Sequence, residues 1–294
     1  MLDDKIGRPF SMILDRPNGQ MNGYMPTRYR VSVVIPALNE ASNLPHVLPR
    51  IPRWVDEVIL VDGYSTDGTP EIAERLWPGI RIVTQQGNGK GAALRSGFAM
   101  ATGDIIVMLD ADGSTDPAEI PAFVGALLAG ADFAKGSRFA HGGGTADMPA
   151  YRQVGNQCFV RLVRLLFGGR YSDLCYGYNA FWRSLVPLLC LDGDGFEIET
   201  MMNVRALRTG MKVVEVPSVE AKRVYGDGRL KTLPDGWRVL RTIWLERHFA
   251  VRIAVHSWAE SLRHGNDSVP HSNDLHIHDS VISEDPAWIE GRDL

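Results

Sequence analysis

Val31-Ser-Val-Val-Ile35 begins a series of four short apolar runs that decides the fold; the others are Glu57-Val-Ile-Leu-Val61, Ile80-Arg-Ile-Val83 and Asp104-Ile-Ile-Val-Met-Leu109. Each run is rich in β-branched residues, as strands are. Their midpoints lie 26, 23 and 25 residues apart, which leaves room for one strand, one crossover helix and two loops. Strands that alternate with helices form parallel sheets. The sequence therefore predicts an α/β fold with a mostly parallel central sheet flanked by helices.

Local patterns predict where helices begin and where further strands lie. Thr69 with Pro70 is typical of a helix start. Asp116 and Glu119 have the D-x-x-E spacing of a capping box, with Pro117 at the first helical position. Residues 132–135 and 212–216 are candidates for two more strands, and the stretch between them is expected to form the second half of the domain.

The composition indicates one large globular domain with two flexible tails. Of 294 residues, 45% are hydrophobic and 22% are charged, close to the globular average. We predict the domain over residues 31–248, after a flexible segment at 1–30. Residues 249–294 form a C-terminal extension. From His264 onward it carries seven acidic residues and one arginine, a charge of −6 that leaves +2 on the rest of a chain whose net charge is −4. Such an aperiodic acidic stretch predicts disorder from about residue 264.

Cysteine content and apolar run lengths exclude several protein classes. Cys158, Cys175 and Cys190 are odd in number and lack C-x-x-C spacing, which argues against a disulfide framework or a zinc knuckle and fits a reducing compartment. The longest uncharged apolar stretch, 120–131, has 12 residues, whereas a membrane span needs about 20. We expect no membrane span, a cytoplasmic location and no nucleic-acid partner.

Polar residues follow three of the four apolar runs. Asn39-Glu40 follows the first after Pro36, Asp62 follows the second, and Asp110-Ala111-Asp112 follows the fourth. Ligands of open α/β sheets bind beyond the carboxyl ends of the strands. Two carboxylates leaving a buried strand together, with water and phosphate oxygens as further ligands, are typical of a Mg²⁺ or Mn²⁺ site. A solvated turn is the simpler interpretation, but Asp62 at another strand end favours the metal.

The two commonest nucleotide-binding motifs are missing. No G-x-G-x-x-G follows the first run, and Gly89-Lys90 would complete a Walker loop only with Gly at 84 and Ser or Thr at 91. Lys90 nevertheless lies between Gly89 and Gly91, which permit close backbone approach to a ligand. The alternative is a solvated lysine in a glycine-rich turn.

Four motifs occur in the order and at the spacings of family 2 glycosyltransferases, and the sequence resembles that family. They are Val33-Val-Ile-Pro-Ala-Leu-Asn-Glu40, Val61-Asp-Gly-Tyr-Ser-Thr-Asp-Gly-Thr69, Gly89-Lys-Gly-Ala-Ala-Leu-Arg-Ser-Gly97 and Leu109-Asp-Ala-Asp112. Later motifs resemble the dolichyl-phosphate mannose synthase branch: Gly136-Ser-Arg138, Asp173-Leu-Cys-Tyr-Gly-Tyr178, Gly195-Phe-Glu-Ile-Glu199 and Arg223-x-x-Gly226-x-x-Arg229-Leu230. The resemblance covers about residues 31–248.

The resemblance implies a GT-A fold in which a nucleotide sugar lies across the strand ends. Asp110 and Asp112 would hold Mg²⁺ or Mn²⁺ at its diphosphate. The donor-binding residues that it implies are Pro36, Asn39, Glu40, Asp62, Lys90, Asp110 and Ala111. Three positions depart from the family pattern. One aspartate, Asp62, stands where two are common, Ser114 stands where a third metal-side ligand is common, and Gly226-Asp-Gly-Arg-Leu230 lacks the serine of a G-x-S-K-L-like motif.

The acceptor determines which protein groups the reaction needs. A hydroxyl acceptor must lose a proton, and Asp173, Glu197 and Glu199 are candidate bases. A polyprenyl phosphate, with a second pKa near 6 by analogy with phosphoserine, is already ionised and needs cations instead. Surface solvation of the arginines and structural ion pairing of the carboxylates are the simpler alternatives. We predict catalytic roles for Asp112, Asp173 and Arg138, and an acceptor site formed by Arg138, Arg152, Glu199, Arg223 and Arg229.

Two amphipathic segments, 158–167 and 237–247, combine bulky apolar residues with arginines three apart. This composition suits a membrane surface, although an apolar helix face is more often part of a core. Peripheral docking at the inner face of the membrane and packing in the core both stay open.

The favoured function is a metal-dependent, inverting glycosyltransferase that uses a nucleotide-diphosphate sugar and a polyprenyl phosphate acceptor. A soluble hydroxyl acceptor is the alternative. A sugar-phosphate nucleotidyltransferase normally has a glycine-rich, Arg-containing loop after its first strand, where this chain has Pro36-Ala-Leu-Asn-Glu40. A scaffold without activity would not need Asp62, Lys90, Asp110 and Asp112 together.

Overall fold

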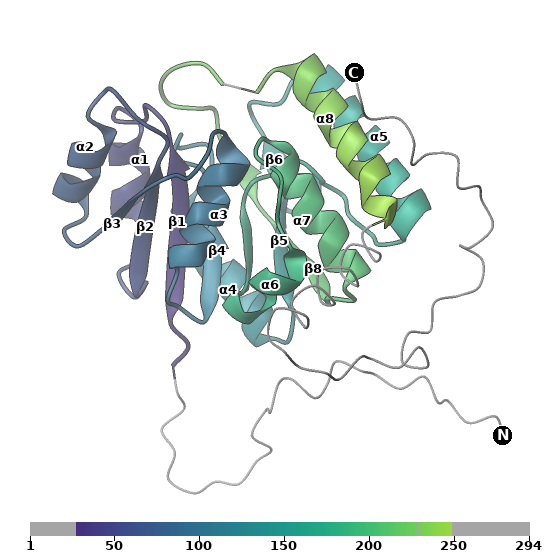
Figure 1. Cartoon of the computed structure of the whole chain (residues 1–294), viewed down its shortest axis with the longest axis horizontal. Helices are drawn as coiled ribbons and strands as arrows, with labels where there is room; N and C mark the ends of the chain where they lie inside the picture. The colour runs from purple at the N-terminus through teal and green to yellow at the C-terminus, as the bar shows by residue number, and fades with distance from the viewer. Residues whose placement is uncertain (1–27, 229, 249–294) are drawn as a thin grey trace, which may run out of the picture.

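The computed structural model describes residues 28–228 and 230–248 and has a seven-stranded sheet at its centre (Figure 1). The strand order is β3-β2-β1-β4-β7-β5-β8. All neighbours are parallel except β7, which runs antiparallel to β4 and β5. The strands span Val31–Ala37 (β1), Glu57–Asp62 (β2), Arg81–Thr84 (β3), Ile105–Met108 (β4), Phe133–Ser137 (β5), Asn179–Trp182 (β7) and Val213–Pro217 (β8). The prediction of a mostly parallel α/β sheet is confirmed.

The six strands predicted from the sequence are β1 to β5 and β8, each within two residues of the expected ends. Strand β7 was not predicted. It has four residues, begins with the buried Asn179, and is inserted between β4 and β5 from a distant part of the chain. Its short sequence has no alternating pattern, so only tertiary pairing makes it a strand.

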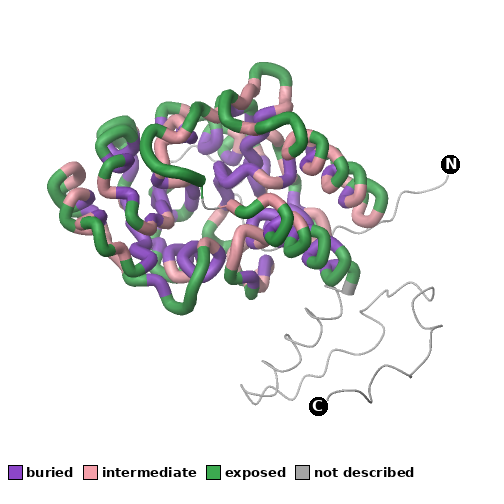
Figure 2. The backbone as a smooth tube through the Cα atoms, turned by 90° about the horizontal axis from the view of Figure 1, so that it is seen from above, coloured by how far each residue is buried: buried purple, intermediate pink, exposed green. Residues whose placement is uncertain are grey.

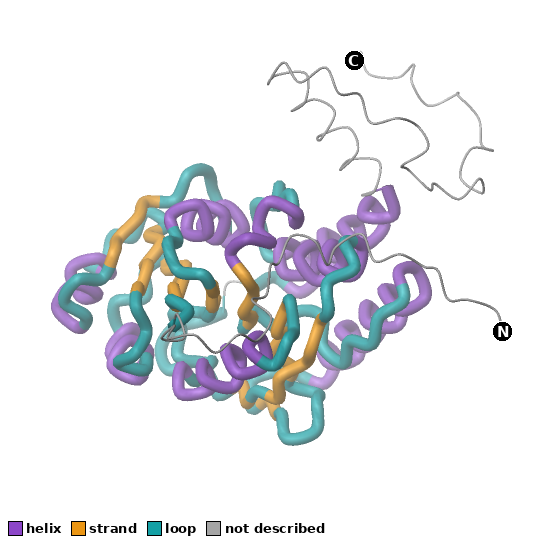
Figure 3. The backbone as a smooth tube through the Cα atoms, turned by 90° about the horizontal axis from the view of Figure 1, so that it is seen from below, coloured by secondary structure: helices purple, strands orange, loops and turns teal. Residues whose placement is uncertain are grey.

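Helices cover both faces of the sheet, and Figure 3 shows the strands running between these layers. Val33 and Ile35 of β1 pack in a cluster that includes Leu44 and Phe123, whereas Val34 packs in a separate cluster with Leu94. Successive strand residues therefore enter opposite cores, as the pleat requires. One face carries α1 (Leu44–Val47), α2 (Thr69–Leu76) and α4 (Ile120–Leu128); the other carries α3 (Lys90–Met100), α6 (Val186–Leu189) and α7 (Glu197–Arg208). Figure 2 shows the buried positions inside this arrangement and the exposed ones on its outer turns.

The two predicted helix starts are observed, with one correction. Thr69 is the first residue of α2 and Pro70 is the second. Asp116 accepts a hydrogen bond from the Ala118 amide at 2.9 Å, before the short 3₁₀ helix Pro117–Glu119. Glu119 does not complete a capping box, because its carboxylate accepts hydrogen bonds from the Val219 amide and the Ser218 hydroxyl instead.

A third cluster lies beyond the sheet, where α5 (Ala150–Phe167) and α8 (Thr232–Leu245) lie side by side against α7 (Figure 1). Val160 and Val163 of α5 and Val239 and Ile243 of α8 are buried there. The inner faces of the two amphipathic segments are therefore core. The outer faces expose other apolar side chains, including Leu165, Trp237 and Trp244 at 81%, 67% and 55%.

Two very short strands, β6 (Gly144–Thr145) and β9 (Val219–Glu220), pair in parallel next to the main sheet. Other short 3₁₀ helices span Leu48–Arg50, Arg183–Leu185 and Glu246–His248. Among the described residues, no helix is both long and apolar enough to cross a membrane. The predictions for the N-terminal segment up to residue 27 and for the extension from residue 249 lie outside the described residues.

Candidate active site

A cavity of about 460 Å³ opens beyond the carboxyl ends of β1 and β4, and ten of the fourteen predicted site residues line it. Asn39, Asp62 and Asp173 are outside its lining, and Arg229 is not among the described residues. Of the residues that line it, those predicted to bind the donor or its metal are Pro36, Glu40, Lys90, Asp110, Ala111 and Asp112, and those predicted to bind the acceptor are Arg138, Arg152, Glu199 and Arg223.

Asn39 and Asp62 shape the two loops that border the donor side. Asn39 has a left-handed backbone (φ 52°), and its Oδ1 accepts a hydrogen bond from the Thr66 amide at 2.8 Å. The Asp62 carboxylate accepts from the Ser65 amide at 3.2 Å. The loops after β1 and β2 are thus tied to each other by side-chain contacts.

Lys90, at the start of α3, forms the first of three charged clusters. Its Nζ lies 2.6 Å from Asp110 Oδ1 and 2.6 Å from Glu199 Oε1. Burial acts to lower the Lys90 pKa, but the two carboxylates outweigh it and raise the pKa. For Glu199, burial raises the pKa, and this effect outweighs the opposite effect of Lys90. A Cβ on Gly177 would lie 2.8 Å from both Lys90 Nζ and Glu199 Oε1, so a side chain there would displace the ends of this pair.

The glycines beside Lys90 also allow close packing of another loop. A Cβ on Gly89 would lie 2.3 Å from the Asp194 carbonyl oxygen, and one on Gly91 would lie 2.3 Å from that of Gly193. The Gly91 amide donates to the Asp194 oxygen at 2.7 Å. The two glycines therefore admit the loop at 193–194, which holds the start of α3, and Gly89 also lines the cavity beside Lys90.

Arg223 forms the second cluster. Its Nη2 lies 2.5 Å from Glu40 Oε1 and its Nη1 lies 3.3 Å from Asp112 Oδ2. Asp112 Oδ1 accepts hydrogen bonds from the amide and hydroxyl of Ser114 at 2.9 and 2.7 Å. Ser114, which departs from the family pattern, therefore orients one of the two aspartates.

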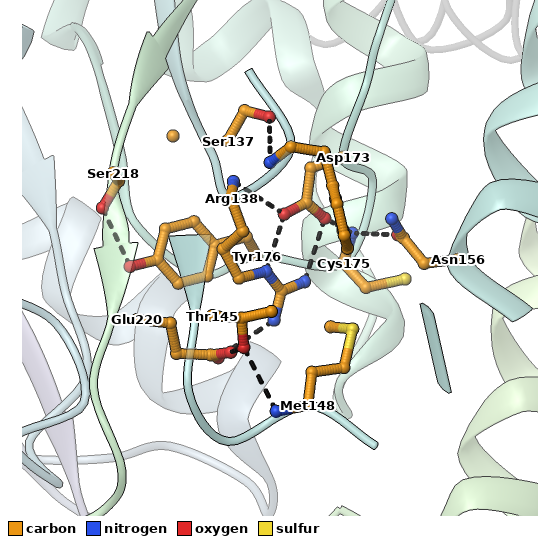
Figure 4. A network of polar contacts seen from close by, with 12 residues as sticks. Ser137, Arg138, Thr145, Met148, Asn156, Asp173, Cys175, Tyr176, Ser218 and Glu220 are labelled. Carbon is orange, nitrogen blue, oxygen red and sulfur yellow. Dashed lines mark hydrogen bonds and ion pairs between the residues drawn. The ribbon is translucent and has the colours of Figure 1, made fainter. Parts of the chain in front are cut away.

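Arg138 forms the third cluster, drawn in Figure 4. It donates to Asp173 through Nε at 2.7 Å and Nη2 at 2.9 Å, and to Glu220 Oε1 through Nη1 at 2.9 Å. Its guanidinium carbon also lies 4.7 Å from the Tyr176 ring centroid. Burial acts to raise the Asp173 pKa, but the hydrogen bonds and charge of Arg138 outweigh it and lower the pKa. Asp173 is therefore a fully buried carboxylate held by Arg138.

Each cluster joins one cation to two carboxylates, so each has a formal charge of −1 when its carboxylates are ionised. Asp110 and Asp112 line the cavity with 28% and 22% of their side chains exposed. Among the described residues, no three His, Cys, Asp or Glu side chains converge on a metal position. The two aspartates fit a cation that takes its other ligands from water and phosphate, as Mg²⁺ does.

Arg152 differs from the other cations that line the cavity. Its Nε donates to the Thr232 hydroxyl at 3.1 Å and its Nη2 to the Leu230 carbonyl oxygen at 3.3 Å. Both partners are neutral, and within the described part of the chain no carboxylate pairs with Arg152. Its charge is therefore available to an anionic ligand.

The sequence did not point to three residues that shape this region. Glu220 is the second acid on Arg138 and comes from β9, which was not predicted. Lys135 is fully buried, and its Nζ donates to the carbonyl oxygens of Gly136 and Tyr176. Asn156 lines the cavity from α5. Each residue type is unremarkable in its local sequence, so no local pattern could have identified it.

Residues 32–187 match the family model described as glycosyl transferase family 2. The chain belongs to this family. The match covers β1 to β7, both aspartates after β4, and Arg138, Arg152 and Asp173. The resemblance inferred from the motifs is confirmed, and the protein is a glycosyltransferase.

Curated relatives and solved structures agree with this assignment. Glycosyltransferase AglJ of Haloferax volcanii is 35% identical over 72% of this chain and 70% of its own length. Polyprenol monophosphomannose synthase of Mycolicibacterium smegmatis is 33% identical over 70% of this chain and 82% of its own. Glucosyl-3-phosphoglycerate synthase of Mycobacterium tuberculosis, solved with Mn²⁺, UDP-glucose and phosphoglyceric acid, gives a TM-score of 0.59 at 28% identity, over 74% of this chain and 79% of that one. The fold is the GT-A fold of these glycosyltransferases.

Proposed function

We propose that this glycosyltransferase transfers a sugar from a nucleotide-diphosphate sugar to a polyprenyl phosphate, with a divalent metal and with inversion at the sugar. One observation carries the proposal: a single cavity joins the charged strand ends at Asp110 and Asp112 to a region between α5 and α8 where Phe159 and Val239 provide apolar lining beside Arg152. A relative named polyprenol monophosphomannose synthase supports it. An anionic head group with a hydrocarbon chain matches both ends of such a cavity.

On the donor side, Asp110 and Asp112 would hold Mg²⁺ or Mn²⁺. The ion would stabilise the negative charge that grows on the departing diphosphate. Lys90 is held beside Asp110 by Glu199, and Arg223 is held beside Asp112 by Glu40, so two cations stand where that charge develops. The M. tuberculosis synthase has been solved with UDP and either Mn²⁺ or Mg²⁺, which supports this use of the site.

On the acceptor side, Arg152 would bind the phosphate. A lipid monophosphate with a second pKa near 6 is largely ionised at pH 7, so it can attack the anomeric carbon without a base. A single displacement inverts the configuration at that carbon.

Asp173 is proposed to orient Arg138 rather than to act as a base. Both of its oxygens accept hydrogen bonds from Arg138, and one also accepts from the Cys175 amide at 3.3 Å. A base needs an accessible lone pair and a pKa near the working pH, whereas Asp173 is buried and its pKa is lowered.

A soluble phosphorylated acceptor is the second candidate, because the M. tuberculosis synthase is solved with phosphoglyceric acid. The deciding assay offers purified protein a panel of nucleotide sugars with Mn²⁺, and either polyprenyl phosphate or phosphoglyceric acid. We expect nucleoside diphosphate release and a glycosyl lipid with polyprenyl phosphate. Transfer to the soluble acceptor alone would reject the lipid proposal.

We also propose that the protein is cytoplasmic and docks on the inner face of the membrane through the outer faces of α5 and α8. Trp237 and Trp244 are exposed there, next to the exposed Arg241. Aromatic and basic side chains together favour an anionic bilayer surface.

Replacing both tryptophans by alanine should reduce cosedimentation with phosphatidylglycerol vesicles. Trp54→Ala, at a 38% exposed tryptophan outside both helices, is the matched control. Equal binding of all variants would reject docking through these faces.

A further inference from the structure

Two glycines lie inside the helices that line one end of the cavity. Gly155 is inside α5 and Gly236 is inside α8, and both line the cavity. Apart from proline, glycine is the least favourable residue in a helix interior. A Cβ on Gly155 would meet no described atom within 4 Å, and one on Gly236 would meet only Phe159 Cζ, at 4.0 Å. Packing within the protein therefore does not require glycine at either position.

Apolar and charged side chains both line the cavity around these glycines; the charged ones include Asp235, which accepts hydrogen bonds from the Lys231 amide and Arg238. Met148, Phe159 and Val239 line the same end of the cavity. Arg152, three residues before Gly155, brings a charge that no described carboxylate neutralises. This combination suits a monophosphate attached to a hydrocarbon chain.

Asn156 gives independent evidence for a ligand at this place. It is 3% exposed and lines the cavity. Its Oδ1 accepts hydrogen bonds from the amides of Leu174 and Cys175 at 3.1 and 3.3 Å, which fixes the orientation of the side chain. Its Nδ2 has no hydrogen-bond partner among the described residues. Buried donors are normally paired, so this amide group lacks a partner that a phosphate oxygen would supply.

The protein surface beside Gly236 is apolar. Leu233 and Trp237 flank Gly236 on α8 and are exposed at 85% and 67%. A long chain that passes between α5 and α8 would leave the protein over an apolar rim.

We propose that Gly155 and Gly236 determine acceptor specificity, because their missing side chains leave space for the first isoprene units of a polyprenyl monophosphate. The head group then reaches Arg152 and Asn156. This inference rests on the proposed function and adds the residues that select the lipid chain.

The test measures binding of farnesyl monophosphate and of inorganic phosphate to Gly155→Leu and Gly236→Leu by calorimetry, with nucleoside diphosphate and Mn²⁺ present. Each leucine should fill the space of about one isoprene unit and weaken farnesyl phosphate binding up to about 1,000-fold, since each of five buried carbons contributes about fourfold. Binding of inorganic phosphate should change far less. Gly125→Leu is the matched control, because Gly125 is inside α4, its Cβ would also meet nothing within 4 Å, and it does not line the cavity.

Alanine variants separate space from helix stability. Gly155→Ala and Gly236→Ala should raise Tm by about 2–4 °C, because alanine favours the helix, and yet weaken farnesyl phosphate binding. Three results would overturn the inference. Both leucine variants could bind farnesyl phosphate as tightly as the wild type, or they could lose inorganic phosphate binding as much as farnesyl phosphate binding. The third result is that the wild type does not bind farnesyl phosphate. In a fourth result, the wild type binds farnesyl phosphate and the leucine variants do not, and yet no sugar is transferred to polyprenyl phosphate. That result would support the inferred binding site and reject the proposed function.

Discussion

Asp173→Asn distinguishes a positioning role for the Arg138–Asp173 pair from a catalytic base. The two side chains are 4% and 0% exposed and share hydrogen bonds of 2.7 and 2.9 Å. Breaking a buried ion pair from one side costs about 3–5 kcal/mol. We expect about 3 kcal/mol, the lower end of that range, because Glu220 still accepts from Arg138. At about 2–4 °C per kcal/mol for a domain of this size, Tm should fall by roughly 6–12 °C.

The same variant should change the pH dependence of stability. Burial acts to raise the Asp173 pKa, but Arg138 outweighs it, so the folded pKa is below the unfolded one. The folded protein then binds fewer protons than the unfolded chain, and the stabilisation is complete above the unfolded pKa of about 3.9 and lost as the pH falls through the folded value. Below about pH 4, the free energy of unfolding measured in urea should therefore fall more for the wild type than for Asp173→Asn.

Activity completes the test, with kcat/KM measured where both proteins are folded. Arg138→Gln and the double variant complete a double-mutant cycle. The double variant should lose less stability than the sum of the two single losses. A positioning pair leaves the pH–rate profile of Asp173→Asn unchanged. A normal Tm with a 10²- to 10⁴-fold loss in kcat, together with loss of the acidic limb of the profile, is what a general base would give, and it would refute the positioning role.

Three further changes test the rest of the site. Asp112→Asn should abolish transfer and weaken Mn²⁺ binding without unfolding the protein, because it removes one ligand charge at the cavity rather than in the core; full activity in saturating EDTA would contradict the metal assignment. Gly177→Ala should weaken nucleoside diphosphate binding about 10-fold, since its Cβ would lie 2.8 Å from Lys90 Nζ and Glu199 Oε1 and overpacking costs about 1–3 kcal/mol; an unchanged Kd would show that the Lys90 cluster is not needed for the donor. Deleting residues 265–294 should leave kcat/KM unchanged because of their acidic, aperiodic composition, and a large loss in a folded truncation would place them in the site.

The fold was predictable where local sequence determines local structure. Strands β1, β2 and β4 are buried on both faces and read as continuous apolar runs, so their type and order follow from the sequence. Strand β7 could not be predicted, because its pairing with β4 and β5 comes from residues more than 40 positions away. The same holds for β6 and β9, which have two residues each.

The candidate site was predictable in its residue types but not in its pairings. Asp110, Asp112 and Lys90 are in motifs, but Arg138 meets Glu220 across 82 residues, and Arg223 meets Glu40 across 183. Only the folded chain shows that each of three cations is shared by two carboxylates. A donor diphosphate that enters this cavity faces an excess of negative charge, and Coulomb repulsion at such short range is weakly screened. A divalent cation at Asp110 and Asp112 would offset that excess as the donor binds. Charge balance therefore supports metal dependence independently of the D-x-D spacing.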